Sequence, residues 1–195
     1  GDFTFSRGTD TATRVNSSGL IEKERANYAL YSEDFSQWIT FGAATITTGV
    51  NDPNGGTTAA TISNIPSGNI ADGLRLQNNP MSIPAGNVVC TSLYMKGTGT
   101  INISLERGIS GTYFFYTKTF TLTSSWQRFD FFNAIPAAAN GFQIYVSNAT
   151  GTTATSVDVA FAQVEFGTAP TEYIATNGSS AIVGITDNLP RLDYS

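Results

Sequence analysis

The stretch TINISLERGISGTYFFYTKTFTL (100–122) decides the fold class, because it contains two runs in which the side chains alternate in character. In the first run, Ile101, Ile103 and Leu105 point to one face of a strand, and the polar residues between them point to the other. The second run places Phe114, Tyr116, Lys118, Phe120 and Leu122 on one face and Tyr113, Phe115, Thr117 and Thr119 on the opposite face. A period of two is typical of strands with one buried face, so the stretch predicts a β-hairpin against a core.

Further strand signals surround this hairpin, and helix signals are scarce. Short β-branched and aromatic runs alternate with turns rich in Gly, Asn and Pro. The other predicted strands cover 11–15, 20–24, 44–48, 58–63, 69–77, 87–97, 126–132, 141–147, 156–166, 181–185 and 190–194, and only SEDFSQW (32–38) indicates a short helical turn. This pattern predicts an all-β, antiparallel β-sandwich with short N- and C-terminal β arms.

The bulk composition excludes several classes of function. The 195 residues suit one sandwich with arms, and the charged share of 13% is about half the usual one. A surface rich in hydroxyls and amides suits extracellular or virion proteins that face sugars, although any soluble β protein with polar loops shares it. The net charge is −5 without a basic cluster, so no nucleic-acid partner is expected. No apolar stretch approaches the roughly 18 residues of a membrane span, and the first ten residues lack the blocks of a signal peptide, so neither membrane insertion nor a cleaved leader is expected.

The cysteine and histidine counts narrow the chemistry. One cysteine, Cys90, allows no internal disulfide, and its apolar surroundings NVVCTSLYM predict a buried structural thiol. The absence of histidine excludes Ser-His-Asp and Cys-His catalysis and the usual zinc sites.

The outward face of the sheet carries the candidate binding residues. Sugar binding needs aromatic faces for the pyranose ring and planar polar groups for its hydroxyls. The predicted carbohydrate-binding residues are Arg75, Gln77, Asn102, Glu106, Tyr113, Phe115, Arg128, Asp130, Gln143 and Tyr145. Two alternatives stay open: binding by loop tips, and a face without a sugar site, on which Arg128 and Asp130 merely pair across strands with Glu106 or Lys118.

Four segments in order resemble motifs of the carbohydrate-binding jelly rolls of the xylan- and glucan-binding type. They are NYALYSEDFSQW (27–38), VVCTSLYMKG (88–97), SSWQRFDFF (124–132) and SVDVAFAQVEFGTAPTEYI (156–174). The resemblance implies a jelly-roll domain over 27–176 that binds a polysaccharide without catalysis. It also implies that Trp38 and Trp126 pack inside the domain.

The same resemblance implies a structural calcium ion near the first and last strands. The matching carboxylates are Glu33 or Asp34 and Asp158 or Glu165. Calcium needs six to eight oxygens, which two carboxylates and backbone carbonyls can supply. The alternative is that these acids are ordinary solvated side chains. The loop NDPNGG (51–56) is explained by a turn, and no other cofactor is expected.

The two ends of the chain resemble parts of one segment that is common in phage and prophage tail proteins. These parts are FTFSRGTDTATRVNSSGLIEK (3–23) and GITDNLPRLDYS (184–195). The resemblance implies that the arms 1–26 and 177–195 pair as one small β unit around an inserted sandwich, because sandwich termini often lie close together. Flexible linkers are the alternative. A virion (tail or fibre) or extracellular location follows, with a cell-surface glycan and other virion protein segments as partners.

We therefore expect a non-catalytic carbohydrate-binding module that attaches a virion to host surface glycans. The alternative from another class is a ligand-free structural or assembly domain of the virion. A third reading, a polysaccharide-degrading enzyme, would need two carboxylates about 5 to 9.5 Å apart, for which Glu106 and Asp130 are available. No catalytic motif accompanies them, so we expect no enzyme activity.

Overall fold

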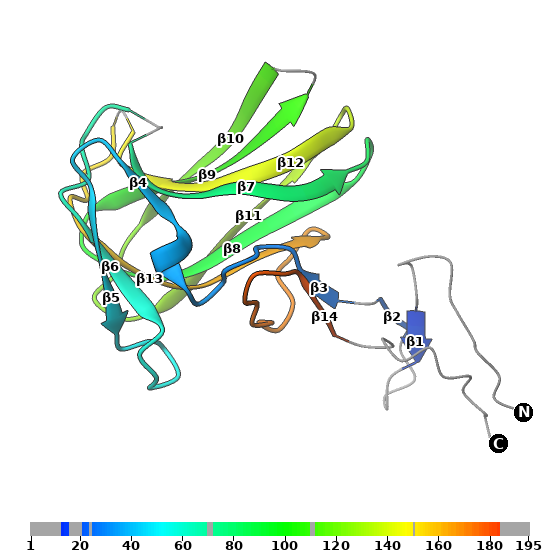
Figure 1. The fold of residues 1–195 in the computed structure, drawn as a ribbon, viewed down its shortest axis with the longest axis horizontal. Helices are drawn as coiled ribbons and strands as arrows, with labels where there is room; N and C mark the ends of the chain where they lie inside the picture. The colour runs from blue at the N-terminus through cyan, green and yellow to red at the C-terminus, as the bar shows by residue number, and fades with distance from the viewer. Residues whose placement is uncertain are drawn as a thin grey trace, which may run out of the picture.

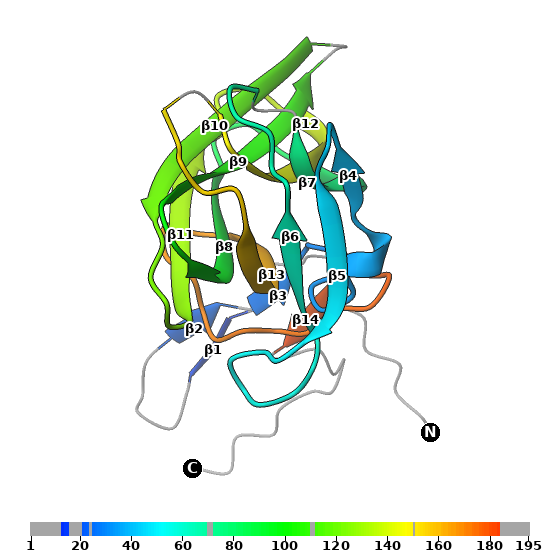
Figure 2. The same cartoon turned by 90° about the vertical axis from the view of Figure 1, so that its left-hand side faces the viewer.

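The chain folds into a sandwich of two five-stranded antiparallel sheets (Figures 1 and 2). This computed structural model describes residues 13–15, 21–23, 25–69, 72–109, 112–149 and 151–183, without the side chains of 13–15, 21–23, 77–82, 109 and 112. The first sheet has the order β10 (Thr112–Thr121), β9 (Thr100–Ile109), β12 (Ala139–Ser147), β7 (Gly73–Ile83) and β4 (Ile39–Phe41). The second has the order β11 (Gln127–Ala134), β8 (Val88–Gly97), β13 (Val157–Phe166), β6 (Ala59–Ser63) and β5 (Thr45–Val50). The predicted all-β sandwich is confirmed.

The core lies between the two sheets and follows the predicted alternation. Ile101, Ile103 and Leu105 of β9 are fully buried and belong to one large apolar cluster. The ring of Phe120 on β10 lies 5.2 Å from that of Phe129 and 6.5 Å from that of Phe131, both on β11. These aromatic contacts join the two sheets, because β10 and β11 belong to different ones.

Short strands flank the sandwich at one end (Figure 1). β1 (Thr13–Val15) pairs with β2 (Ile21–Lys23), which confirms the predicted N-terminal hairpin. β3 (Arg25–Asn27) pairs with β14 (Ala181–Val183), so the segments that precede and follow the sandwich lie side by side. The predicted strand 190–194 lies outside the described residues. In the described part of the chain, no helix has the length and hydrophobicity to cross a bilayer.

A buried polar network, which we name the clamp, ties 27–32 to 162–176. The Asn27 amide nitrogen donates to the carbonyls of Ala162 and Ile174, both at 2.8 Å, and its oxygen accepts from the Val164 N–H at 3.1 Å. Ser32 and Thr176 exchange further hydrogen bonds, in which the Thr176 N–H donates to the Ser32 hydroxyl at 2.7 Å. The clamp therefore closes the sandwich where the two arms leave it.

Several local predictions are confirmed or adjusted. The 3-10 turn η1 (Phe35–Gln37) confirms the helical turn within 32–38, and Trp38 is buried in the core. Trp126 is only partly buried, against a small cluster around Phe161 and beside Lys96. Cys90 is buried, and burial raises the pKa of its thiol to about 12, as a structural cysteine requires.

The strand boundaries differ from the predicted ones in the first sheet. β7 begins at Gly73 and continues to Ile83, whereas the predicted strand covered 69–77. β3 and β4 were not predicted, because three-residue strands carry too few residues to display alternation.

Candidate functional site

The outward side of the first sheet collects polar and aromatic side chains, and we call it the polar face. Because the core takes the alternate residues of each strand, the pairing registers place its members in cross-strand rows. One row runs from Phe115 through Glu106 to Gln143. The polar face consists of Tyr113, Phe115, Thr117 and Thr119 on β10, Asn102, Ser104 and Glu106 on β9, Gln143, Tyr145 and Ser147 on β12, Arg75 on β7, and Ile39 and Phe41 on β4.

A chain of hydrogen bonds crosses this face. Nη1 of Arg75 donates to the Tyr145 hydroxyl at 2.9 Å, and this hydroxyl donates to the Glu106 carboxylate at 2.6 Å. The other oxygen of Glu106 accepts from the Gln143 amide at 2.7 Å. Burial and the nearby Glu106 carboxylate raise the pKa of Tyr145 to about 12, so the phenol keeps its proton. The tyrosine therefore links a cation and an anion that do not touch directly.

Aromatic rings stand at both margins of the polar face. On β10, Tyr113 is 62% exposed and Phe115 is 40% exposed, and the Phe115 ring meets Tyr145 edge-on with centroids 5.6 Å apart. On the opposite margin, the Arg75 guanidinium lies 3.8 Å from the centre of the Phe41 ring. Flat apolar surfaces thus flank a floor of hydrogen-bonding groups.

The floor contains buried polar atoms without a partner. In the described part of the chain, such atoms are Arg75 Nε, Gln143 Oε1, Ser147 Oγ and Thr91 Oγ1. All of them except the Thr91 hydroxyl belong to the polar face. An unsatisfied buried polar group costs about 1–3 kcal/mol, so these three atoms leave hydrogen-bonding capacity unused within the polar face.

The structure brings most of the predicted binding residues together. Seven share the polar face, with the buried ones forming its floor: Arg75, Asn102, Glu106, Tyr113, Phe115, Gln143 and Tyr145. Gln77 lies on β7, but its side chain is outside the described part.

The prediction that Arg128 and Asp130 share one face with the other candidates was wrong. They lie on β11, which pairs with β8 in the second sheet, because the chain crosses between sheets after β10. Arg128 donates there to the Ser92 hydroxyl at 2.9 Å and to the Thr171 carbonyl at 2.5 Å, and so braces the segment after β13. Sheets pack about 10 Å apart, and Glu106 and Asp130 point away from each other on the two outer surfaces, so they do not form the carboxylate pair of a glycosidase.

Six members of the polar face were not on the predicted list, namely Ser104, Thr117, Thr119, Ser147, Ile39 and Phe41. Ser104 and Ser147 follow the alternation of predicted strands and could have been found from it. Phe41 lies on β4, whose three residues give no pattern, so its place under Arg75 needed the structure.

Three of the four carboxylates proposed for calcium have partners within the protein. Asp158 forms an ion pair with Lys96 at 3.3 Å, near the start of β13. Glu165, seven residues further along this strand, accepts instead from the Thr171 N–H at 2.9 Å, and Asp34 accepts from the Ser36 N–H as the cap of η1. Among the described residues, no group of three or more acidic, cysteine or histidine side chains could hold a metal ion. Bound calcium stays a prediction.

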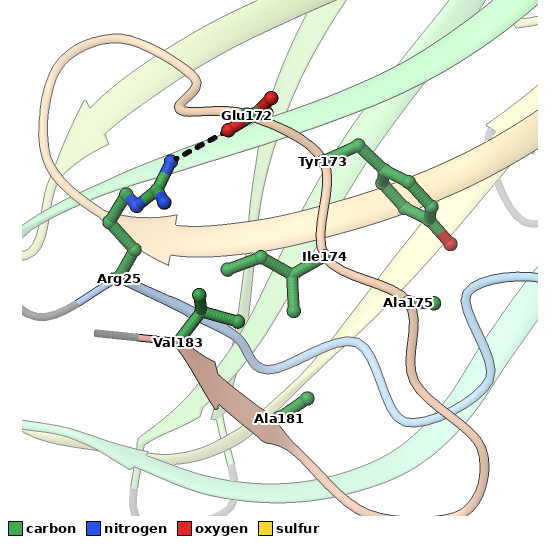
Figure 3. A pocket seen from close by; sticks show the side chains of 7 residues that line it. All are labelled: Arg25, Glu172, Tyr173, Ile174, Ala175, Ala181 and Val183. Atoms are coloured by element: carbon green, nitrogen blue, oxygen red, sulfur yellow. Dashed lines mark hydrogen bonds and ion pairs between the residues drawn. The ribbon is translucent and has the colours of Figure 1, made fainter. Parts of the chain in front are cut away.

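A pocket of about 330 Å³ lies at the arm junction (Figure 3). Ile174, Ala181 and Val183 give it an apolar lining, and the ion pair between Arg25 and Glu172 spans its rim at 3.3 Å. Because Arg25 and Glu172 pair with each other, the pocket offers a ligand mainly apolar contacts. The polar face is therefore the stronger candidate site.

Comparison with known proteins supports the fold assignment. No family model and no curated protein sequence matches the chain. Among solved structures, it resembles the CBM22-1–GH10 modules of Clostridium thermocellum endo-1,4-β-D-xylanase 10B, described in complex with xylohexaose, with a TM-score of 0.55 and 19% identity over 78% of this chain and 30% of that one.

Two single modules match over nearly their whole length. The C-terminal family 22 carbohydrate-binding module of Clostridium thermocellum Xyn10B has a TM-score of 0.54 and 19% identity, covering 75% of this chain and 94% of that one. The CBM22-2 xylan-binding domain of Paenibacillus barcinonensis Xyn10C has a TM-score of 0.53 and 14% identity, covering 73% and 98%. At this identity the likeness establishes the jelly-roll fold of these modules.

Proposed function

We propose that this protein is a non-catalytic carbohydrate-binding module that holds a polysaccharide or cell-surface glycan on its polar face. The observation that carries the proposal is the concentration of buried, unpartnered polar atoms on that face, on Arg75, Gln143 and Ser147, beside the exposed rings of Tyr113 and Phe115. A pyranose matches both features. Its hydroxyls donate and accept hydrogen bonds, and its apolar side stacks on an aromatic ring.

The fold adds independent support. The similar modules are named for xylan binding or were described with xylohexaose. This chain shares their architecture at 14–19% identity, so we take from them the class of ligand, a polysaccharide, and not the individual sugar.

In the proposed complex, the sugar chain crosses the strands from β10 towards β4. Tyr113 and Phe115 supply the stacking surface, and Glu106 and Gln143 accept from sugar hydroxyls. Arg75, whose guanidinium lies 3.8 Å from the centre of the Phe41 ring, donates to ring or hydroxyl oxygens of the sugar. Charge-assisted hydrogen bonds of this kind are stronger than neutral ones, so Arg75 and Glu106 would set the orientation of the sugar.

We further propose that the module belongs to a phage tail or fibre protein and serves in attachment to the host surface. This part rests on the sequence resemblance of the two arms to tail-protein segments. Detection of the domain in purified virions by a specific antibody would test it.

Glycan binding is tested with the full chain on a glycan array, followed by calorimetry with each polysaccharide that binds. Tyr113→Ala and Phe115→Ala should each weaken binding about fivefold, because a stacked ring contributes about 1 kcal/mol. Phe132→Ala is the matched control, since Phe132 is 55% exposed on the outer surface of the second sheet.

Two results would contradict the proposal. The wild-type chain could bind no glycan on the array, which would favour the ligand-free virion domain. Alternatively, Phe132→Ala could weaken binding as much as the β10 variants, which would move the site to the other sheet. Near-ultraviolet circular dichroism of every variant confirms that the fold is retained.

A further inference from the structure

The two sheets end in four edge strands, and β10 differs from the other three. Natural sheets protect their edges by short strands, bulges, proline or charged side chains. β4 has three residues, β5 has a register shift between Thr48 and Val50, and β11 carries Arg128 and Asp130. β10 has ten residues, no proline, and an unbroken register of ten pairs with β9. It lacks the usual protection against pairing with another strand.

The side chains of β10 leave its free edge open. Tyr113, Phe114 and Phe115 are 62%, 42% and 40% exposed. Lys118 is the strand's only charged residue, and its ammonium group lies 3.5 Å from the Asp130 carbonyl and 5.2 Å from the centre of the Phe120 ring. It therefore turns towards the second sheet. Among the described residues, β10 pairs with no strand other than β9.

We propose that β10 pairs antiparallel with β10 of a second copy of this chain, on a two-fold axis at Tyr116. Side chains alternate along β10, so even-numbered residues point to the core side and odd-numbered residues to the polar face. In a pair of β10 strands, core-side residues lie opposite core-side residues only when the two paired residue numbers add up to an even number. The register centred on Tyr116 sets Lys118 of one copy opposite the exposed Phe114 ring of the other, on the same side of the sheet. Facing Lys118 residues, which would repel each other, are thereby avoided.

The strand's own sequence is what favours a second copy as the occupant. It carries both a cation, Lys118, and an exposed ring, Phe114, which the Arg107 guanidinium of the same chain also approaches to 4.8 Å from the ring centre, so the contact is made twice in a two-fold pair. The first sheets of the two copies would form one continuous sheet, and both polar faces would lie on the same side of it. A dimer would thus present two weak glycan sites to one surface and raise avidity. The pairing itself does not depend on the proposed glycan function.

Self-association is tested by sedimentation equilibrium of the full chain without glycan, from 1 µM to 1 mM (about the range expected for a small interface). Phe114→Lys places like charges opposite each other and should raise the dimer dissociation constant at least tenfold. Phe114→Glu places opposite charges there and should lower it. The double variant Phe114→Lys/Lys118→Glu should restore dimerisation, because it exchanges repulsion for attraction.

Phe132→Lys, on the outer surface of the second sheet, is the matched control and should leave dimerisation unchanged. Amide exchange gives a second readout that needs no variant: exchange in Thr112–Thr121 should slow at high protein concentration, whereas exchange in the β5 edge should not. A chain that stays monomeric at 1 mM, or variants at Phe114 that leave the dissociation constant unchanged, would overturn the proposal. Glycan binding by the monomer would remain testable in either case.

Discussion

Tyr145 is the side chain that connects the two charged groups of the polar face. It is 2% exposed, so it offers little surface for stacking, and its hydroxyl is occupied by Arg75 and Glu106. Its pKa, raised to about 12 by burial and by the Glu106 carboxylate, also excludes a phenolate nucleophile at neutral pH. In the proposed function, Tyr145 would therefore position the two charged groups, and the exposed rings of β10 would provide the contact surface.

Tyr145→Phe should destabilise the fold and weaken glycan binding together. Loss of the hydroxyl leaves Arg75 Nη1 and one oxygen of Glu106 without this partner, which costs about 1–3 kcal/mol in the free energy of unfolding. Urea denaturation measures this loss, and calorimetry should show about fivefold weaker binding. Tyr113→Phe is the control for the urea measurement, because the Tyr113 side chain is largely exposed. An unchanged urea midpoint in Tyr145→Phe would show that the link does not stabilise the face.

Asp52 makes stability depend on pH in the acid range. Its carboxylate accepts from the N–H groups of Asn54, Gly56 and Thr58 and from the Thr58 hydroxyl, at 2.8–3.2 Å. Burial alone would raise its pKa, but these hydrogen bonds prevail and lower the pKa below the ordinary 3.8. Because the pKa is lower in the folded state, the ionised Asp52 stabilises the fold. This stabilisation is fully present at pH values above the unfolded-state pKa and is lost as the pH falls through the folded-state pKa.

Asp52→Asn should therefore destabilise the protein at pH 7 by about 1–2 kcal/mol and by clearly less at pH 3. Urea midpoints at the two pH values measure the difference. Glu172→Gln serves as the control, because the Glu172 side chain is 84% exposed and its removal should change little at either pH. The same loss at pH 3 and pH 7 in Asp52→Asn would contradict the assignment.

The individual strands show what alternation can and cannot predict. In β9 and β10, residues that point into the core alternate with residues that point away from it, so the alternation predicted the strands, the core face and most of the polar face. Alternation does not say which sheet a strand joins, and Arg128 and Asp130 were therefore assigned to the wrong one. It also does not give accessibility: Asn102 and Glu106 point outward yet are 3% and 5% exposed.

The boundaries of β7 were missed for a related reason. Pro80 interrupts the strand signal after Gln77, because proline lacks the N–H that a ladder uses. In the structure, β7 continues through Pro80 to Ile83, and its pairing with β12 shifts register on both sides of Phe142. Such irregular pairing accommodates a proline, and it is a property of two strands that one strand's sequence does not display.

Gly73 allows β7 to begin beside β12. Its φ is +138°, and an added Cβ would lie 2.2 Å from the Val146 carbonyl oxygen. Gly73→Ala should therefore destabilise the fold by about 2 kcal/mol or more, measured by thermal or urea unfolding. Gly86→Ala is the control for backbone strain alone. Gly86 also has a positive φ, +82°, but no heavy atom lies within 4 Å of an added Cβ, so the substitution there causes no steric clash. Equal losses in both variants would mean that the close approach to β12 is not limiting.

In the molecule as a whole, the junction with the arms and the candidate binding face lie at different locations. The arms leave beside the clamp, where β3 and β14 pair (Figure 1), whereas the polar face covers the outside of the first sheet. The clamp begins at Asn27 and ends at Thr176, which are also the predicted limits of the jelly-roll domain. A sandwich closed by its own side chains in this way does not need the β3–β14 ribbon to hold its ends together.

The fragment 27–176 should therefore fold alone and unfold in one cooperative step. We expect its free energy of unfolding to lie within about 1 kcal/mol of the full chain's, because the core and the clamp are retained and only short outer strands are lost. Asn27→Ala in the fragment should then cost about 3 kcal/mol or more, since the carbonyls of Ala162 and Ile174 and the N–H of Val164 lose a buried partner. Urea denaturation followed by tryptophan fluorescence measures both. If the fragment is unfolded while the full chain is stable, the arms are part of the folding unit, and closure by the clamp is insufficient.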